Sequence, residues 1–221
     1  MMTYNYIQAT VMLTVLAIGS QYANAVEKDE AFDLVAGYHW LSPGTDEDWS
    51  GASGAEIQGR FWRDDHVGIA LVGSFDTWEA RTEVYEEDTG DTYAYTSIMG
   101  DASVTSLGAS LLYRSQPTED IILGMNIGFR YALVDSTIYA EAAYDGPGGP
   151  RYLYDKINID NTMLLVIGSE MEFELSHDIS LILGAGYQVD LNKPEETYAG
   201  SSLGETKLNA SSFSLLLSCA F

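Results

Sequence analysis

Basic residues are scarce in this chain of 221 residues. Only 10 Lys and Arg stand against 33 Asp and Glu, which gives a formal net charge of −23 at pH 7. A protein with this balance has no basic stripe that could neutralise phosphates, so nucleic acid is excluded as a partner. The same excess of acid argues against binding to an anionic cytoplasmic leaflet.

Cysteine and proline are also rare. The single cysteine, Cys219, excludes an intramolecular disulfide framework and any zinc site built from cysteines. Five prolines accompany 21 glycines and 15 tyrosines, and this mixture is typical of strands rather than of helical bundles or disordered segments. We expect no cofactor.

Charged side chains are missing from the first 25 residues. The apolar run Val11–Gly19 is too short to span a bilayer, which needs about 20 residues, and it is followed by Ala23-Asn24-Ala25. Small residues at these positions are typical of a signal-peptide cleavage site. We therefore expect residues 1–25 to be a secretory signal peptide, cleaved after Ala25, and residues 26–221 to form one exported domain.

Long hydrophobic runs are missing from the rest of the chain, so no helix that spans a membrane is predicted. Eight stretches instead alternate between apolar and polar residues with a period of two, which predicts strands. These stretches are 31–41, 54–63, 66–78, 102–114, 120–134, 162–175, 178–190 and 209–221.

The connections between these stretches are long and short in turn. The short ones are 64–65, 115–119 and 176–177, and the long ones are 42–53, 79–101, 135–161 and 191–208. This order predicts an up-and-down meander with two different ends, as in outer-membrane barrels with short periplasmic turns and long extracellular loops. Because a sheet in hydrocarbon cannot leave open edges, we expect the last strand to pair with the first.

Aromatic residues on the more apolar face gather near the strand ends. One predicted ring contains Phe32, Phe61, Tyr113, Phe173 and Phe221, and the other contains Tyr38, Trp40, Phe75, Phe129, Tyr131 and Tyr187. Two such girdles match the preference of amphipathic rings for membrane interfaces. The opposite face is rich in Gly and Ser, which suits the narrow interior of an eight-stranded barrel. We therefore predict an all-β, closed, eight-stranded antiparallel transmembrane barrel.

With these features, residues 26–221 resemble the small bacterial outer-membrane β-barrel family of the OmpA/OmpX type. In that family, a final aromatic residue with apolar residues at alternate positions before it resembles the signal read by the outer-membrane assembly machinery. The pattern is matched here by Phe213, Leu215, Leu217, Cys219 and Phe221, without the glycine often found inside it. The resemblance implies an integral protein of the outer membrane of a Gram-negative-type bacterium, with membrane lipid, lipopolysaccharide and the assembly machinery as partners. It implies no activity.

The inward face carries charged and polar residues of both signs. They are Asp33, His39, Glu56, Gln58, Arg60, Asp76, Arg114, Arg130, Glu170, Glu172, Gln188 and Asp190. A porin-like path for ions or small solutes is one interpretation, and a network of salt bridges that fills the lumen is the other. Because eight strands leave no aqueous bore, we favour the network. We expect Arg60 and Arg130 to pair with Glu170 and Glu172, with Glu56 as a further member.

The long connections hold more than half of the acidic residues. Capture of divalent cations is one interpretation, but no stretch has the spacing of a calcium loop, and we favour a solvated, repulsive surface. Within 135–161, two β-prone runs around a Gly/Pro turn predict a hairpin. Connections 79–101 and 135–161 are candidate binding surfaces for an extracellular partner, because tyrosine is favoured at interfaces. We otherwise expect a monomer.

Two further functions compete with a structural or surface-interaction role. His39, Ser74 and Asp76 reach the same height near the outer rim and could form a hydrolytic group, but no local motif supports it, and we predict no enzyme. A secreted, soluble barrel of lipocalin type would use the apolar face to line a ligand cavity. Solubility without detergent after signal removal would distinguish this alternative from a membrane barrel.

Overall fold

The computed structural model describes residues 31–44, 48–88, 93–116, 118, 121–145 and 149–221. The predicted signal peptide and its cleavage site lie outside these residues. Within the described part of the chain, no helix is both long enough and apolar enough to cross a membrane.

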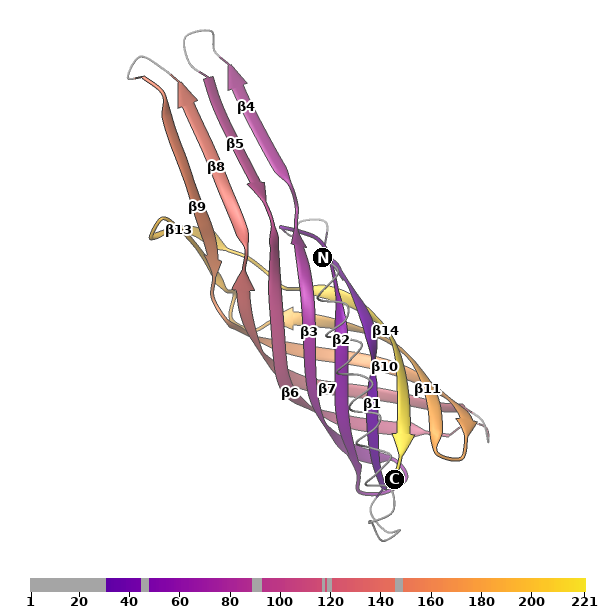
Figure 1. Ribbon diagram of the computed structural model, residues 1–221. Coiled ribbons are helices and arrows are strands. Elements are labelled where there is room, and N and C mark those ends of the chain that lie inside the picture. The colour runs from indigo at the N-terminus through magenta and orange to yellow at the C-terminus, as the bar shows by residue number, and fades with distance from the viewer. Residues whose placement is uncertain (1–30, 45–47, 89–92, 117, 119–120, 146–148) are drawn as a thin grey trace.

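Eight strands form a closed antiparallel barrel in the order β1-β14-β11-β10-β7-β6-β3-β2 (Figure 1). Their bounds are β1 Ala31–Pro43, β2 Trp49–Trp62, β3 Val67–Ala80, β6 Asp101–Ser115, β7 Ile121–Ser136, β10 Thr162–Ser176, β11 Ile179–Asp190 and β14 Ala210–Ala220. The first and last barrel strands pair along their lengths, from Asp33 opposite Ala220 to Pro43 opposite Ala210. The prediction of a closed eight-stranded barrel is confirmed, and each predicted strand overlaps an observed one.

Side-chain alternation places the apolar face outside. On β7, Met125, Ile127 and Phe129 are exposed on the outer surface, whereas Gly128 and Ala132 lie buried on the inner one. Successive side chains of a strand point to opposite faces, and paired strands keep this alternation in step. The barrel therefore has an apolar exterior and a mixed interior.

The connections at one end of the barrel are tight. Between β2 and β3, the carboxylate of Asp64 accepts hydrogen bonds from the backbone N–H groups of His66 and Val67, at 2.8 Å each. These two bonds lower the pKa of Asp64, because they favour its charged form. A short polar turn of this kind reverses the chain without further secondary structure.

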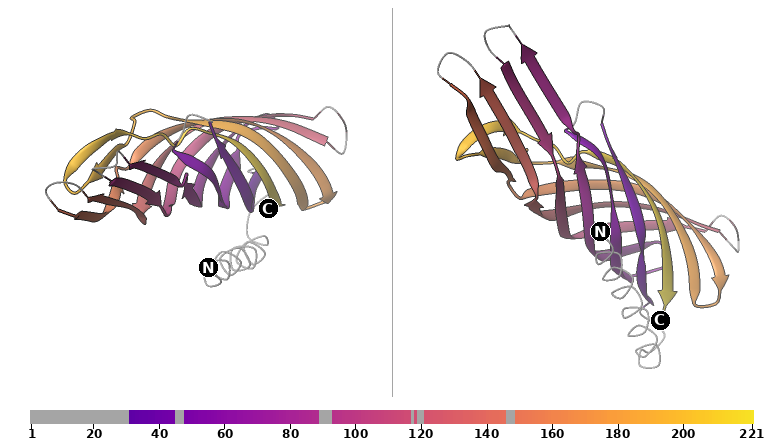
Figure 2. Two further views of the ribbon diagram at one scale, coloured as in Figure 1. Left: turned by 90° about the horizontal axis from the view of Figure 1, so that it is seen from above. Right: turned by 45° about the horizontal axis from the view of Figure 1, so that its top comes forward.

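Three of the four long connections form hairpins of their own. They supply β4 (Glu83–Asp88), β5 (Tyr93–Met99), β8 (Ile138–Asp145), β9 (Arg151–Ile159), β12 (Glu195–Tyr198) and β13 (Ser201–Glu205). Together they make a second sheet in the order β13-β12-β9-β8-β5-β4, here called the outer sheet. Figures 1 and 2 show the hairpins β4–β5 and β8–β9 side by side, extending beyond the barrel. The hairpin predicted within 135–161 is confirmed, whereas the strands within 79–101 and 191–208 were not predicted.

The fourth long connection is shorter than predicted. Strand β1 continues to Pro43 and β2 begins at Trp49, so the expected connection 42–53 shrinks to residues 44–48. Barrel strands β1 and β2 therefore have no continuation in the outer sheet, whose two edges are β4 and β13.

Buried apolar residues form three clusters along the barrel. The largest lies where the barrel meets the outer sheet and includes Trp49, Trp78, Ile138 and Ile157. A second cluster around Trp62 lies near the end with the short turns. The third consists of Val35, Ile182 and Leu216. Polar side chains occupy the interior between the first two clusters.

Candidate functional site

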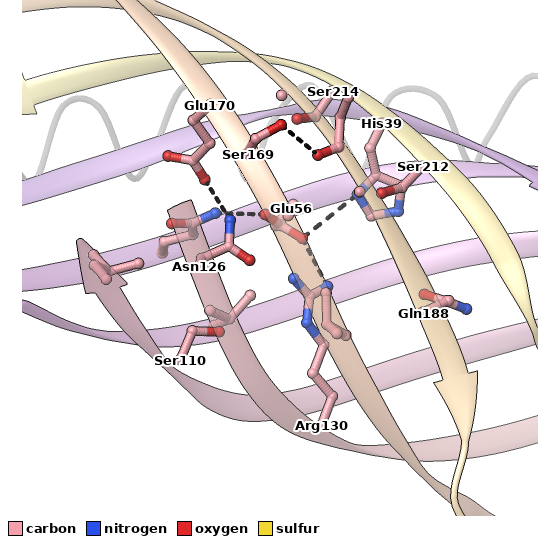
Figure 3. A pocket seen from close by; sticks show the side chains of 18 of the residues that line it. His39, Glu56, Ser110, Asn126, Arg130, Ser169, Glu170, Gln188, Ser212 and Ser214 are labelled. Atoms are coloured by element: carbon pink, nitrogen blue, oxygen red, sulfur yellow. Dashed lines mark hydrogen bonds and ion pairs between the residues drawn. The ribbon is translucent and has the colours of Figure 1, made fainter. Parts of the chain in front are cut away.

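The middle of the lumen holds two ion pairs between strands. Arg60 Nη2 lies 2.8 Å from Glu170 Oε2. Arg130 Nη1 lies 2.7 Å from Glu56 Oε2, as Figure 3 shows. Gln58 connects them, because its amide donates to Glu56 at 2.6 Å and its oxygen accepts from Arg60 Nε at 2.7 Å. These contacts join β2 to both β7 and β10. They satisfy charges that would otherwise be costly to remove from water.

A second polar group lies on β1, β3 and β6. The His39 ring bonds through Nε2 to Asp76, and its Nδ1 lies 3.7 Å from Glu56 Oε2. Ser74 donates to the other Asp76 oxygen at 2.9 Å and contacts the hydroxyl of Ser106 at 2.8 Å. All these side chains are buried. The group is thus continuous with the ion pairs through Glu56.

This geometry differs from that of a hydrolytic triad. A nucleophilic serine needs the histidine between itself and the carboxylate, so that the ring can take its proton. Here Asp76 lies between Ser74 and His39 and bonds to both. The structure brings together the three residues considered from the sequence, but the serine hydroxyl is directed at a carboxylate and not at the imidazole.

Tryptophan side chains lie at the two ends of this polar region. Towards the outer sheet, Trp49 and Trp78 are each 1% exposed, and their rings meet edge to face with centroids 5.5 Å apart. Towards the short turns, Trp62 Nε1 donates to Asp33 at 2.5 Å, and the Arg114 guanidinium stacks 3.8 Å from the Trp62 ring centroid. Buried tryptophan rings therefore lie on either side of the polar side chains.

A small cavity remains between the two ends. It measures about 50 Å³ and is lined by His39, Glu56, Arg130 and Gln188, among other residues. Figure 3 shows these polar groups pointing into the shared space from different strands. A volume of this size holds a few water molecules.

The outer surface of the barrel carries the predicted aromatic residues, although Phe129 and Phe75 lie near the middle of β7 and β3 and not at their ends. Near the short turns, Phe32 packs on Phe61 with centroids 4.9 Å apart and on Phe221 at 6.0 Å. Near the outer sheet, Trp40 packs against Tyr38 at 4.9 Å and against Phe213 at 6.0 Å. The remaining predicted members also lie on outward positions of their strands: Tyr113, Phe173, Phe75, Phe129, Tyr131 and Tyr187.

Strand β14 presents the residues of the predicted assembly signal outward. Phe213, Leu215 and Leu217 are exposed, and Cys219 follows them on the same face as a half-buried free thiol. The backbone N–H of Phe221 donates to the carbonyl oxygen of Phe32 at 2.9 Å. The end of the chain is therefore tied to the start of β1.

The outer sheet has tyrosines on its outward face. Tyr139 of β8 stacks on Tyr154 of β9, with nearly parallel rings and centroids 5.3 Å apart. Tyr152 and Tyr93 are also exposed there. Within the described residues, no group of three or more His, Cys, Asp or Glu side chains is arranged to hold a metal ion.

Comparisons with known proteins identify the fold. No family model matches the sequence, and no curated protein matches it either. The outer membrane protein OprG from Pseudomonas aeruginosa aligns over 88% of this chain and 97% of its own, with a TM-score of 0.58 and 10% identity. A major outer membrane protein from Thermus thermophilus aligns over 88% of this chain and 100% of its own, with a TM-score of 0.53 and 14% identity. The chain has the fold of a small outer-membrane β-barrel.

Within this outer-membrane barrel fold, the structure corrects one predicted pairing. The sequence predicts that Arg130 pairs with Glu170 or Glu172, but it pairs with Glu56. Glu170 of β10 stands opposite Gly124 of β7. Gly124 is six residues from Arg130, which is about 20 Å along a strand, so Glu170 lies far from Arg130. Glu172 instead lies beside Ser180 of β11. Arg60 is paired with Glu170, as expected.

The tryptophans at the ends of the barrel lumen were missed by the sequence reasoning. The alternation of the strands could have revealed two of them, because residues two apart on a strand point to the same face. Trp62 therefore shares the inward face of β2 with Arg60, and Trp78 shares the inward face of β3 with Asp76. Trp49 lies before the predicted start of its strand, so no parity could be assigned to it.

Proposed function

We propose that this protein is an integral outer-membrane β-barrel with a closed lumen, which acts through its outer sheet as a structural or surface-interaction protein and not as an enzyme. The observation that carries the proposal is the burial of large rings on both sides of the polar interior: Trp49 and Trp78 at one end, and Trp62, stacked with Arg114, at the other. The outer sheet then offers an exposed surface that includes Tyr93, Tyr152 and Tyr154.

The outer surface of the barrel supports a lipid environment. Leu71, Leu107 and Met125 are each more than 60% exposed, and they belong to a belt of Leu, Ile, Val, Met and Phe around the barrel. A soluble protein rarely exposes a continuous apolar surface of this extent. A closed barrel pairs its backbone groups between strands, which hydrocarbon requires. The aromatic residues near the strand ends would lie at the two interfaces.

Within the proposed membrane, the protein would be a monomer surrounded by lipid and lipopolysaccharide. The outward apolar residues of β14, with Phe221, would present the signal to the assembly machinery. Signal cleavage after Ala25 would precede insertion. The short turns would face the periplasm, and the outer sheet would lie outside the cell.

Conductance in a planar bilayer tests the closed lumen. We expect the refolded protein to show no stable unit conductance, because the tryptophans and the ion pairs fill the path. The double variant Trp49→Ala/Trp78→Ala removes the outer closure and should admit flickering currents if it still folds. A stable, large conductance of the unaltered protein would contradict the closed lumen and favour the porin-like alternative.

Two simple measurements test the membrane location. The folded barrel should migrate faster in mild-detergent gels before heating than after it, and it should stay in the membrane fraction during a carbonate wash. Release by carbonate as a detergent-free soluble protein would favour the lipocalin-like alternative.

A further inference from the structure

Strand β9 has an open edge over its outer half. Strand β12 pairs only with Ile157, Asn158 and Ile159, which leaves Arg151–Asp155 paired on one side, with β8, within the described residues. Along this half, Tyr152 is 77% exposed, Leu153 50% and Tyr154 68%. A flat strand edge that carries exposed apolar residues is a template for pairing with another chain.

The backbone groups that face this edge can be identified. The N–H of Lys156 donates to the side chain of Asp155 at 2.8 Å, so it is not directed at β8. In an antiparallel pair, alternate residues direct both backbone groups to the same neighbour. The N–H and C=O groups of Tyr152 and Tyr154 therefore point to the open side, like those of Lys156.

The sequence along the edge, Arg151-Tyr152-Leu153-Tyr154-Asp155, complements itself when it is reversed. We propose that a second copy of this chain pairs with it in antiparallel fashion, with the two Leu153 residues opposite each other. Tyr152 then faces the second copy's Tyr154 on one side of the sheet, and Arg151 faces the second copy's Asp155 on the other. The twofold symmetry gives two such charge pairs, and each consists of one arginine and one aspartate. Aromatic pairs and pairs of opposite charge stabilise adjacent strands.

The hydrogen-bond pattern agrees with this register. Tyr152 and Tyr154 direct their backbone groups outward, so each would form a hydrogen-bonded pair with its counterpart, while the two Leu153 residues form the non-bonded pair at the twofold axis. Centring on Tyr154 would bring the second copy against Ile157, where β12 already occupies the edge. Centring on Tyr152 would oppose Tyr154 to Pro150, which has no N–H to donate.

The direction of β9 sets the arrangement of the two barrels. This strand runs from the tip of the outer sheet back towards β10 (Figure 1). Antiparallel pairing therefore places the two barrels at opposite ends of the joined sheets. Resting on the proposed function, this arrangement joins copies in two facing outer membranes. The net charge of each copy opposes their approach, but at 0.15 M salt this repulsion is screened beyond about 8 Å.

Vesicle clustering with charge reversals tests the contact. In the proposed dimer, position 151 of one copy faces position 155 of the other. Arg151→Asp therefore places two aspartates opposite each other, and Asp155→Arg places two arginines opposite each other. Each variant should lose clustering with itself, through a rise of at least about tenfold in the dimer dissociation constant. Vesicles carrying one variant should cluster with vesicles carrying the other, because both opposite-charge pairs are then restored. The matched controls Arg63→Asp and Asp178→Arg, at the short turns, should cluster like the unaltered protein.

A cysteine at the twofold axis gives a second readout in detergent. In a Cys219→Ser background, Leu153→Cys should oxidise to a covalent dimer, because a non-bonded antiparallel pair brings the two Cα atoms within disulfide range. Tyr152→Cys, which faces Tyr154 instead of itself, should cross-link much less.

The outcomes separate this proposal from the proposed function. If every variant keeps the heat-modifiable gel mobility and the reversals do not change clustering, or the unaltered vesicles never cluster, then self-pairing is overturned and the membrane barrel stands. Loss of heat-modifiable mobility in the unaltered protein would overturn the barrel proposal itself, and self-pairing with it.

Discussion

The ion pair between Arg130 and Glu56 is the residue-scale feature on which the lumen most depends. Its side chains are 11% and 8% exposed, and they come from β7 and β2, which are not adjacent in the barrel. In a buried pair, the cost of desolvation roughly offsets the attraction, but loss of one partner leaves an uncompensated charge. The pair therefore specifies how opposite walls face each other more than it adds stability.

A double-mutant cycle tests this dependence. Arg130→Met should lower the free energy of unfolding by about 3–5 kcal/mol, because Glu56 loses its cation. The double variant Arg130→Met/Glu56→Gln should lose clearly less than the sum of the single losses. Urea unfolding in lipid vesicles provides the measurement, with Arg63→Met at the exposed turn as the control. Additive losses would contradict a direct coupling.

We expect Glu196 to make the stability of the outer sheet depend on pH. Its carboxyl lies half-buried on β12, and desolvation, followed by repulsion from Asp48, raises its pKa above the ordinary 4.5. A carboxyl with a raised pKa in the folded state takes up a proton on folding. Glu196 contributes its full stabilisation below pH 4.5, where it is protonated in both the folded and the unfolded state. This stabilisation is lost as the pH rises through the raised pKa of the folded state.

Amide exchange at β12 measures this effect. At pH 7, Glu196→Gln should protect the amide of Thr197 more than the unaltered protein does, since no ionised carboxyl is then buried. Below pH 4.5 the two proteins should exchange alike, because both carry a neutral side chain there. Lower protection in the variant at pH 7 would contradict the direction of the shift.

At the scale of elements, the junction between barrel and outer sheet rests on one apolar cluster. Trp49 and Trp78 come from barrel strands, whereas Ile138 and Ile157 come from β8 and β9. Burial of these rings and side chains against each other joins β8 and β9 to the barrel.

Removal of Trp78 should loosen this junction. Trp78→Ala leaves a cavity among buried residues, and we expect a loss of about 3–5 kcal/mol in the free energy of unfolding. Proteases should then cut the β8–β9 hairpin faster while the barrel keeps its heat-modifiable mobility. Trp40→Ala, on the outer surface with 45% of its side chain exposed, is the matched control and should cost less. Equal cleavage in both variants would contradict a role of Trp78 in the junction.

The strands that could be predicted from the sequence are those whose two faces meet different surroundings. Strand β7 is an example: Met125 lies on its apolar, exposed face, and Gly128 lies on the face that lines the lumen. Strand β4 carries acids on both faces, with Glu86 and Glu87 as neighbours, so it shows no alternation to detect. The partner of Arg130 could not be predicted, because it depends on how strands that are not neighbours face each other across the lumen.

At the scale of the whole molecule, closure depends on the seam between β1 and β14. Gly37 lies at this seam, where a Cβ atom would stand 2.2 Å from the carbonyl oxygen of Leu215 and 2.5 Å from the Cα of Leu216. These are backbone atoms of β14, and they cannot move away without breaking the hydrogen bonds between β14 and β1. A glycine is therefore required for the close approach of the two strands.

Substitution of Gly37 tests the seam. Gly37→Ala should slow or prevent closure, with a loss of at least about 1–3 kcal/mol from overpacking. The readout is the fraction of protein with heat-modifiable mobility after refolding. Gly51→Ala is the control, because nothing lies within 4 Å of a Cβ atom at that position. Equal refolding of the two variants would show that the seam tolerates a side chain.

The orientation of the outer sheet also determines how the molecule would bear mechanical load. Strands β8 and β9 extend beyond the barrel from the ends of β7 and β10 (Figure 1). A pull on a partner strand at the β9 edge, directed away from the membrane, therefore acts along the strands. The hydrogen bonds between the strands are then loaded together in shear, whereas a sideways pull would open them one after another. A contact made of few residues can thus resist a brief stretching force better than its equilibrium affinity alone suggests.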